Sequence, residues 1–364
     1  MVFVGFGNAG QGCARHLLKN RSFLKERRGF AYKVVGIADT LKGSVQNEQG
    51  IDLSKALELV AKGKRLDGDG LPGKKGLSSL ETIKSSGGDV VVEATWTNLK
   101  DGEPGFSHIV TALESGLDVV TSNKGPIALY YRRLANLAKS KGRQLRFEST
   151  VMSGTPVFNL YESCLTGVRV TGLKGILNGT DNYILTEMAA GKSYDETLKR
   201  AQQLGYAEVE PSGDVEGYDP AAKITILANA MMDADVKFGD VAREGITHTT
   251  IDEIRKAEQA SKRIKLLASA MRDQEGEVTA RVKPTLIPLT DLLAHVGGVM
   301  NALQISTDVQ PDVTVMGPGA GGDSAGYGLL NDILSINRLK EGSPIVAQAK
   351  PQHVAIEVRN TTST

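Results

Sequence analysis

The sequence predicts an α/β fold of two domains. The first is built on an open parallel sheet flanked by helices, and the second is an α+β domain with a mixed sheet. Three observations favour this architecture. A glycine-rich turn at residues 5–10 lies between an apolar run and a helical pattern. Short apolar runs then alternate with helical patterns as far as residue 149, which is typical of β-α-β units. Beyond residue 168 the pattern changes to longer strand-like segments with helices between them.

The composition is that of a globular protein without a charged partner. The 364 residues are 40% hydrophobic and 23% charged, and the net charge is +1. Such a chain is long enough for two domains with sizeable cores. A near-neutral charge does not indicate a nucleic-acid or membrane-surface partner, and no apolar run approaches the roughly 18 residues of a membrane span. Cys13 and Cys164 are too few for a disulfide framework, so a cytoplasmic location is the default expectation.

The glycine-rich turn is the first candidate site. Met1 to Val4 reads as a strand, and a helix is expected from Gln11 to about Arg28. The G-x-G-x-x-G spacing between them is that of a Rossmann-type dinucleotide-binding domain, in which the helix N-terminus receives the phosphates. The expected cofactor-binding residues of this turn are Gly5, Gly7, Asn8, Ala9 and Gly10.

A second strand, Tyr32 to Ala38, ends at Asp39. An acid at this position suits a ribose 2′-hydroxyl and favours NAD, whereas nearby Lys42 or Lys62 would suit the 2′-phosphate of NADP. Asp39 is equally well explained as a turn residue that closes the strand. The choice between NAD and NADP therefore stays open.

The remaining elements of the first domain follow in order. Residues 46–76 read as a surface excursion around a short helix at 53–61. Strands are expected at 89–94, 118–121 and 144–148, and helices at 106–115 and 128–141. Thr95 and Lys124 follow the first two of these strands. Open α/β sheets place ligand-contacting residues at such carboxyl ends.

The second domain is expected to begin after a crossover at 148–156. A strand at 170–177 leads to the turn 178–182 at the start of a helix. The N-terminus of this helix could receive the carboxylate of a ligand, or the turn is simply a helix start that Thr180 or Asp181 would cap. Further helices are expected at 194–204 and 251–260. Strands are expected at 265–271, at 277–287 with Pro284 and Pro288 as its bounds, at 300–307 and at 312–316. A second glycine-rich turn, 317–322, precedes a helix at about 324–339, and residues 353–358 could form a strand in the tail.

The stretch from Gly205 to Met232 is the strongest functional signal. It contains five carboxylates and then an apolar helix whose only charge is Lys223; the carboxylates are Glu208, Glu210, Asp214, Glu216 and Asp219. Asp219 is expected to be the helix N-cap, with Pro220 in the first helical position. Since burying an ammonium group is costly unless it is paired, Asp219 is the natural partner of Lys223 four residues later. The alternative is an ordinary surface ion pair.

This stretch resembles a known family. The pattern A201xxxG205-Y206-A207, followed by P211xxD214-V215-x-G217-x-D219-xxx-K223, is similar to the signature of homoserine dehydrogenases. One departure is Glu210, where the family usually has Asp, Asn or Ser before the proline. The resemblance implies reversible reduction of L-aspartate 4-semialdehyde to L-homoserine with NADH or NADPH, in threonine, methionine and isoleucine biosynthesis.

The resemblance also implies roles for individual residues. Lys223 would donate a proton, held by Asp219, with Lys124 beside the nicotinamide and the substrate oxygen. The two lysines are expected to lower each other's pKa, and which of them donates stays open. Glu208 would bind the substrate amino group. The other residues expected at the substrate are Asp214, Asp219, Tyr206 and Thr180, and Thr95 and Gly321 are expected at the cofactor.

The crossover would bind a monovalent cation such as Na⁺ through backbone carbonyls, by the same resemblance. The residues concerned are Glu148, Val151, Ser153 and Thr155. A simple interdomain connection explains the segment equally well.

The expected domain division is residues 1–149 with about 318–364 for the dinucleotide, and 150–317 for substrate binding and dimerisation. The resemblance implies a homodimer acting on a small molecule. Neither a fused aspartate kinase nor a regulatory module is expected.

Alternatives from other classes remain. A sugar or polyol oxidoreductase could use Lys124 but would not explain the carboxylates, and a catalytically silent nucleotide-binding protein would not need both lysines. A semialdehyde dehydrogenase would need a nucleophilic cysteine. Cys13 lies in the helix after the glycine turn, and Cys164 has no nearby histidine.

Overall fold

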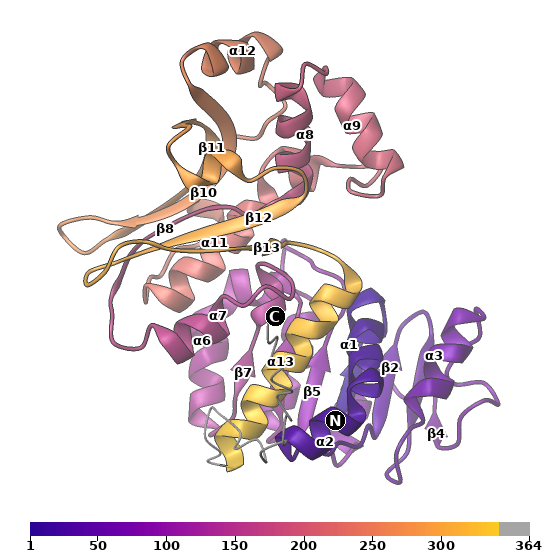
Figure 1. Cartoon of the computed structure of the whole chain (residues 1–364). Helices are drawn as coiled ribbons and strands as arrows, with labels where there is room; N and C mark the ends of the chain where they lie inside the picture. The colour runs from indigo at the N-terminus through magenta and orange to yellow at the C-terminus, as the bar shows by residue number, and fades with distance from the viewer. Residues whose placement is uncertain (342–364) are drawn as a thin grey trace, which may run out of the picture.

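The structure, a computed structural model, describes residues 1–341. It contains two sheets, one above the other in Figure 1, with the C-terminal helix returning to the lower one. This confirms the predicted class of a Rossmann-like domain joined to a mixed-sheet domain. No described helix is long and apolar enough to cross a membrane.

The lower sheet has seven strands in the order β4-β3-β2-β1-β5-β6-β7. The strands are β1 (Val2–Val4), β2 (Gly36–Asp39), β3 (Gly43–Gln46), β4 (Lys74–Lys75), β5 (Val90–Glu93), β6 (Asp118–Thr121) and β7 (Leu145–Arg146). Five neighbouring strands are parallel, in the order β2-β1-β5-β6-β7. At one edge β3 pairs antiparallel with β2, and β4 pairs antiparallel with β3. Because β1 and β5 lead to opposite halves of the sheet, the gap between their carboxyl ends is where such folds bind a ligand.

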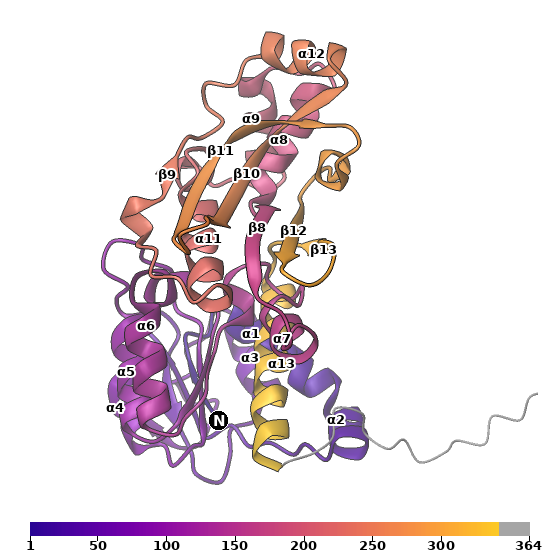
Figure 2. The same cartoon turned by 90° about the vertical axis from the view of Figure 1, so that its left-hand side faces the viewer.

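Helices cover both faces of this sheet (Figure 2). One face carries α1 (Asn8–Lys19), α2 (Arg21–Arg28) and the long α13 (Gly322–Glu341). The other carries α4 (Ser79–Ser85), α5 (Gly105–Glu114) and α6 (Lys124–Ser140), and α3 (Leu53–Ala61) lies at the edge. The parallel strands are buried apolar runs on both sides, as this layered packing requires.

The upper sheet has six strands in the order β13-β12-β8-β10-β11-β9. They are β8 (Val170–Ile176), β9 (Ala242–Arg243), β10 (Lys262–Arg272), β11 (Val278–Pro288), β12 (Met300–Thr307) and β13 (Val313–Pro318). All pairs are antiparallel except β11 with β9. The helices of this part are α7 (Phe158–Cys164), α8 (Gly179–Ala189), α9 (Tyr194–Gln203), α10 (Ser212–Val215), α11 (Tyr218–Met231) and α12 (Ile251–Gln259), with 3-10 turns η1 (Glu148–Thr150), η2 (Phe238–Asp240) and η3 (Leu292–His295).

Two connections join the sheets. The chain leaves the lower sheet through β7 and η1, and it returns from β13 into α13, which packs along α1 and against η1. The buried helix α11 contacts β8, β10 and β11 on one side and α6 on the other. One continuous hydrophobic cluster therefore extends from α5 and α6 through α11 to the upper sheet.

Several element predictions need correction. The helix expected from residue 11 to 28 is broken at Asn20, whose side chain and backbone both donate to the carbonyl of His16. The excursion at 46–76 contributes β4 and follows β3, so it extends the sheet. Pro284 lies inside β11, opposite Leu266, and does not bound it. A proline is tolerated there because β9 pairs only with Arg281 and Val282, which leaves the rest of β11 as an edge.

Three further boundaries of helices and strands differ from those predicted. The helix expected from Ala128 begins at Lys124, because Asn123 caps it by accepting a hydrogen bond from the N–H of Gly125. The strand expected at 144–148 ends at Arg146 and turns into η1. Helix α11 begins after Gly217, a glycine in the left-handed region at φ 78°, so Asp219 is not its N-cap. The possible strand at 353–358 lies outside the described residues.

Candidate functional site

The two sheets meet where the carboxyl ends of β5 and β6 approach the first turns of α8 and α11. Lys124 begins α6, directly after β6, and Asp219 lies in the first turn of α11. The Nζ of Lys124 is 3.1 Å from Oδ1 of Asp219. This ion pair brings together groups from the two sheets, so it places the candidate site at their junction.

Asp219 holds a second ammonium group. The Nζ of Lys223 is 2.7 Å from Oδ2 of Asp219 and donates a 2.6 Å hydrogen bond to the carbonyl of Leu177. Lys223 is only 6% exposed, because α11 is buried on nearly all sides. The predicted burial of Lys223 and its pairing with Asp219 are therefore confirmed. The single carboxylate between two lysines is the central feature of the site.

The charges act on one another unequally. Burial lowers the pKa of Lys223 and the charge of Lys124 lowers it further, although Asp219 opposes both. The pKa of Lys124 is raised, because attraction to Asp219 exceeds the effect of burial. Burial would raise the pKa of Asp219, but the two lysines together hold it well below its ordinary value. The expected lowering by the other lysine is confirmed for Lys223, whereas the net shift of the Lys124 pKa is upward because of Asp219.

Asn178 connects this cluster to α8. Its Nδ2 donates to Oδ1 of Asp214 at 2.8 Å and to Oδ2 of Asp219 at 2.9 Å. Its Oδ1 caps α8 by accepting from the N–H of Asp181, so the cap is neither Thr180 nor Asp181. Asn178 was not among the site residues predicted from the sequence. Its place between a strand and a helix, three residues before an acid, was the available signal.

The acidic loop is only partly drawn into the cluster. Thr180 donates from Oγ1 to the carbonyl of Tyr206 at 2.7 Å, which ties the loop to α8. Tyr206 is 43% exposed, and its ring lies edge-on to Tyr183. Glu208 is exposed, and within residues 1–341 its carboxylate makes no hydrogen bond or ion pair. The structure therefore brings Asp214 and Thr180 to the site but leaves Glu208 in solvent.

The glycine turn has the geometry that a dinucleotide requires. Gly5 has φ 87°, and a Cβ there would lie 2.5 Å from the carbonyl carbon of Ala94. A Cβ on Gly10 would lie 2.4 Å from the oxygen of Gly5, whereas one on Gly7 would meet nothing within 4 Å. Helix α1, with Asn8 and Ala9 in its first turn, has no side-chain cap. Its first N–H groups and the open space at Gly7 suit an anionic pyrophosphate.

Asp39 lies beside this turn. Its Oδ2 accepts from the N–H of Phe6 at 2.7 Å, and its Oδ1 accepts from the N–H groups of Leu41 and Lys42. The Nζ of Lys42 is 3.8 Å from Asp39, so this lysine is near the site but paired. Lys62 is on α3 and pairs with Glu58 at 2.6 Å. Neither lysine is a free cation for a 2′-phosphate.

Two buried residues that were not predicted from the sequence orient the strand ends. Glu93, fully buried at the end of β5, accepts from the N–H and hydroxyl of Thr95 and from the hydroxyl of Thr121 at 2.8 Å. Asn123 donates to Oγ1 of Thr95 at 3.2 Å and to the carbonyl of Trp96 at 3.1 Å. Since Asn123 also caps the helix that begins at Lys124, these bonds fix Thr95 and Lys124 relative to each other.

The second glycine-rich turn returns to the first. A Cβ on Gly322 would lie 2.9 Å from Cβ of Asn8, and Gly321 has φ 114°. A Cβ on Gly12 would come within 2.2 Å of the oxygen of Gly322, and one on Gly326 within 2.2 Å of the nitrogen of Cys13. Glycines thus allow α1 and α13 to pack closely, which places Gly321 near the nucleotide turn.

Glu148, the acid of the crossover, binds backbone N–H groups of the same segment. The carboxylate of Glu148 accepts from the N–H groups of Val157, Phe158 and Asn159 at 2.6, 3.0 and 2.7 Å. Within residues 1–341, no group of three or more His, Cys, Asp or Glu side chains could hold a metal ion. A cation bound by backbone carbonyls at Glu148, Val151, Ser153 and Thr155 stays a prediction.

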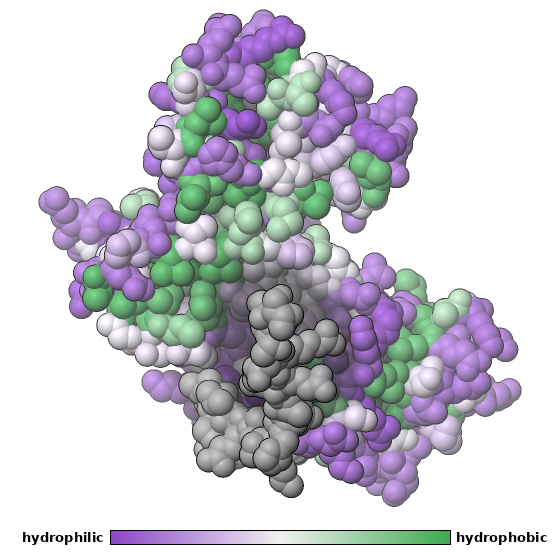
Figure 3. All heavy atoms as spheres, viewed as in Figure 1, coloured by the Kyte–Doolittle hydropathy of each residue, from purple (hydrophilic) through white to green (hydrophobic). Residues whose placement is uncertain are grey.

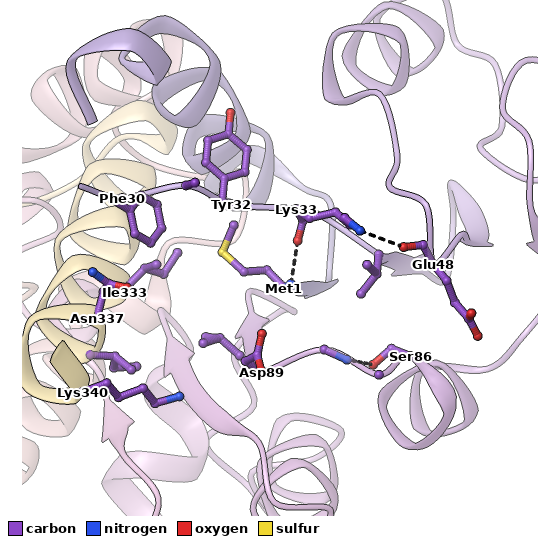
Figure 4. A pocket seen from close by; sticks show the side chains of 16 residues that line it. Met1, Phe30, Tyr32, Lys33, Glu48, Ser86, Asp89, Ile333, Asn337 and Lys340 are labelled. Carbon is purple, nitrogen blue, oxygen red and sulfur yellow. Dashed lines mark hydrogen bonds between the residues drawn. The ribbon is translucent and has the colours of Figure 1, made fainter. Parts of the chain in front are cut away.

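A cavity of about 590 Å³ lies elsewhere (Figure 4). Met1, Asp89 and Lys340 line it, so it is at the amino-terminal ends of β1 and β5. Another, of about 770 Å³, is lined by the segment 166–170 and the end of α11. Because neither is lined by Lys124, Asp219 or Lys223, their size does not indicate the reaction site. Figure 3 shows a recess between the two parts of the molecule on the side of α1 and α9.

Comparisons with known proteins agree with this geometry. Residues 5–148 match the family model "Homoserine dehydrogenase, NAD binding domain", and residues 156–334 match the model "Homoserine dehydrogenase". A protein named NAD(+)-dependent homoserine dehydrogenase from Pseudomonas canavaninivorans is 40% identical over 340 residues, which are 93% of this chain and 96% of that protein. The homoserine dehydrogenase of Methanocaldococcus jannaschii is 37% identical over 92% of this chain and 98% of its own length.

A solved structure agrees as well. The homoserine dehydrogenase of Thiobacillus denitrificans superposes with a TM-score of 0.81 at 34% identity, covering 94% of this chain and 74% of that one.

Proposed function

Because the chain belongs to the homoserine dehydrogenase family of oxidoreductases, we propose that it interconverts L-aspartate 4-semialdehyde and L-homoserine with NAD(H), and that Lys223 carries the transferred proton. The observation that supports this most is the pair of ammonium groups on one partly buried carboxylate, at 2.7 and 3.1 Å from Asp219. The sugar or polyol alternative is not favoured, since both halves of the chain match homoserine dehydrogenase models.

The chemistry follows from the charge that the substrate develops. The glycine turn with Asp39 would hold NADH, which would supply a hydride to the carbonyl carbon. The carbonyl oxygen then gains negative charge, which preorganised cations stabilise. Lys223 donates its proton to that oxygen, Lys124 stabilises the charge, and Asp219 fixes both ammonium groups. In the reverse direction the neutral amine of Lys223 accepts the hydroxyl proton of homoserine.

Lys223 suits the donor role better than Lys124. Its pKa is lowered by burial, so its ammonium is a stronger acid than a free lysine. The pKa of Lys124 is raised by Asp219, so Lys124 keeps its proton and acts as a fixed charge. This difference supports Lys223 as the proton donor.

Asp39 supports a preference for NAD over NADP. Its carboxylate lies next to the glycine turn, held by the N–H of Phe6, where a ribose 2′-hydroxyl is expected to bind. A 2′-phosphate would meet this negative charge, and both candidate lysines are already paired.

The substrate ammonium would bind the carboxylate loop, with Glu208 as its partner. In the described structure Glu208 faces solvent, so it is free to bind an incoming cation. The substitution Glu208→Gln is expected to raise the KM for the semialdehyde about tenfold, as for a lost charged hydrogen bond, with little change in kcat. An unchanged KM would remove Glu208 from substrate recognition. Glu210→Gln, on the same exposed loop, is the matched control.

We also propose that the protein is a homodimer and binds Na⁺. It would act in threonine, methionine and isoleucine biosynthesis, in the cytoplasm. The open face of the upper sheet is a candidate for self-association. Figure 3 shows apolar residues gathered over β8, β10 and β12, and Met271 and Met316 are 49% and 59% exposed. Light scattering should give twice the mass of the chain.

A spectrophotometric assay tests the activity. NADH formation from NAD⁺ should require homoserine and should not occur with glucose or other polyols. Turnover of a polyol without homoserine activity would favour the sugar-type alternative. Binding of NADH without turnover of either would favour a silent nucleotide-binding protein.

A further inference from the structure

The first turn of α8 contains one polar side chain without a partner. Asn178 binds Asp214 and Asp219, and Thr180 binds the carbonyl of Tyr206. Asn182 donates to the carbonyl of Met300 at 3.1 Å. Asp181 is only 1% exposed, and neither of its carboxylate oxygens has a hydrogen-bond partner within residues 1–341.

The neighbours of Asp181 do not compensate a negative charge. Asp214 on α10 and Asp219 on α11 act on it as like charges, and only Lys223 attracts it. A negative charge on Asp181 would also contribute to raising the pKa of Tyr194 on α9.

Strand β10 does not supply a cation to Asp181 either. The ammonium group of Lys265 on β10 is buried, but it donates to Oδ1 of Asn182 at 2.8 Å and to the carbonyl of Val296 at 2.5 Å. Within residues 1–341, no ammonium, guanidinium or N–H group therefore contacts the carboxyl group of Asp181.

A buried carboxylate without donors is strongly disfavoured, so the group takes up a proton instead. Burial is the largest cause, and the charges of Asp214 and Asp219 add to it, which together raise the pKa of Asp181 well above its ordinary value. The geometry and the electrostatics agree on a neutral carboxylic acid.

We propose that Asp181 is a positioning residue that stays protonated in the folded enzyme and thereby keeps Lys223 acidic enough to protonate the substrate oxygen. This inference rests on the proposed role of Lys223. Asp219 already stabilises the ammonium form of Lys223 by direct contact, and Asp214 adds to this. A further full negative charge at Asp181 would hold the proton on Lys223 more firmly. A neutral acid fills the same space without that effect.

Infrared spectroscopy tests the protonation without any turnover. At neutral pH the wild-type spectrum should contain the carbonyl stretch of protonated carboxyl groups, among them Asp332, whose pKa burial raises to about 8. The difference spectrum of wild type minus Asp181→Asn should show one further component of this kind, due to Asp181. Asp118→Asn is the matched control: Asp118 is also 1% exposed, but it accepts from the N–H of Gln144 and lies 2.6 Å from Nζ of Lys340. This control should leave the component unchanged. An Asp181→Asn spectrum that retains it would show an ionised Asp181 and overturn the proposal.

The pH dependence of kcat for semialdehyde reduction tests the influence on Lys223. As pH rises, Asp181 ionises in the wild type, and Lys223 becomes a weaker acid. Asp181→Asn cannot ionise, so the pKa of its Lys223 stays lower and its alkaline loss of activity should occur about one pH unit lower. The KM should change less than the pH profile, because Asp181 is buried away from the substrate. If folded wild type and folded Asp181→Asn lose activity at the same alkaline pH, the proposed influence of Asp181 on Lys223 is overturned.

Unfolding measurements provide a readout that does not depend on the reaction. An unfolded Asp releases its proton near pH 3.9, whereas the folded protein keeps it to a higher pH. Above pH 3.9 the folded state therefore binds more protons, so wild-type stability should fall as pH rises towards the folded pKa. The denaturation midpoint of Asp181→Asn should fall less over the same range. Equal slopes would contradict a protonated Asp181. If homoserine is not turned over at all, the proposed reaction fails, while the infrared and unfolding results still decide the state of Asp181.

Discussion

Asp219 is the residue on which the site depends, because its two carboxylate oxygens hold ammonium groups from different parts of the chain. Lys223 is four residues along the same helix, and Lys124 begins a helix of the other sheet. The first contact is local and the second exists only in the folded molecule. The proposed reactive group is thus assembled by the joining of the two domains.

Lys124 is expected to control the acidity of Lys223. In Lys124→Met the repulsion is removed and Asp219 interacts with Lys223 alone, so the pKa of Lys223 should rise. In the proposed mechanism, reduction requires the ammonium form of Lys223. The alkaline limb of kcat should therefore move to higher pH, by about one unit, while kcat itself falls. The measurement is the pH profile of NADH oxidation.

The control for this change is Lys237→Met, which removes a surface lysine paired with Asp235 at 2.7 Å. Its profile should match the wild type. An alkaline limb that stays in place or moves to lower pH in Lys124→Met would contradict the electrostatic account.

Asp39 is expected to decide the cofactor. Asp39→Ser should reduce the preference for NADH over NADPH, measured as the ratio of kcat/KM values, by about tenfold, as for a lost charged hydrogen bond. A wild-type enzyme that already prefers NADPH would show that Asp39 does not select the nucleotide.

The sequence allowed the i, i+4 partner of Lys223 to be predicted, because an acid and a lysine at that spacing share one helix face. It did not reveal that Lys124 reaches the same carboxylate, since no local pattern records a contact between distant segments. Glu93 and Asn123 were missed for the same reason: their hydrogen bonds join the ends of neighbouring strands.

At the scale of elements, continuous apolar runs were the reliable signal. The strand Asp118–Thr121 and the helix Leu53–Ala61 have the predicted bounds. Helix starts were harder to place. Asp219 looked like an N-cap, but Gly217 begins the helix in a left-handed conformation, and the carboxylate of Asp219 is occupied by the lysines. Functional contacts therefore override a local preference.

The packing of α1 on α13 depends on glycine, since a Cβ on Gly326 would lie 2.2 Å from the backbone nitrogen of Cys13. Gly326→Ala should lower the free energy of unfolding by about 1–3 kcal/mol, because the helices must separate. NADH affinity should also fall, since α13 supports the turn at Gly321. Denaturant titration and NADH binding provide the measurements.

Gly239→Ala is the control, because a Cβ there meets nothing within 4 Å. It should change stability by less than about 0.5 kcal/mol. Equal stability of the two variants would show that α1 and α13 do not pack as closely as described.

At the scale of the whole molecule, each of the two sheets positions different residues of the candidate site. The lower sheet presents the glycine turn, Thr95 and Lys124 at its carboxyl edge, and the upper part supplies Asp219 and Lys223. The sequence predicted both architectures from periodicity, but the arrangement of α11 between α6 and the upper sheet depends on tertiary packing. Reaction is therefore expected to need groups from both parts at the substrate.

The most direct test of this account is the turnover of Lys223→Met in semialdehyde reduction, with NADH affinity measured on the same preparation. The account predicts a kcat lower by about 10² or more, the range of a lost acid catalyst, with NADH affinity unchanged. Turnover close to that of the wild type in a folded, NADH-binding variant would contradict it.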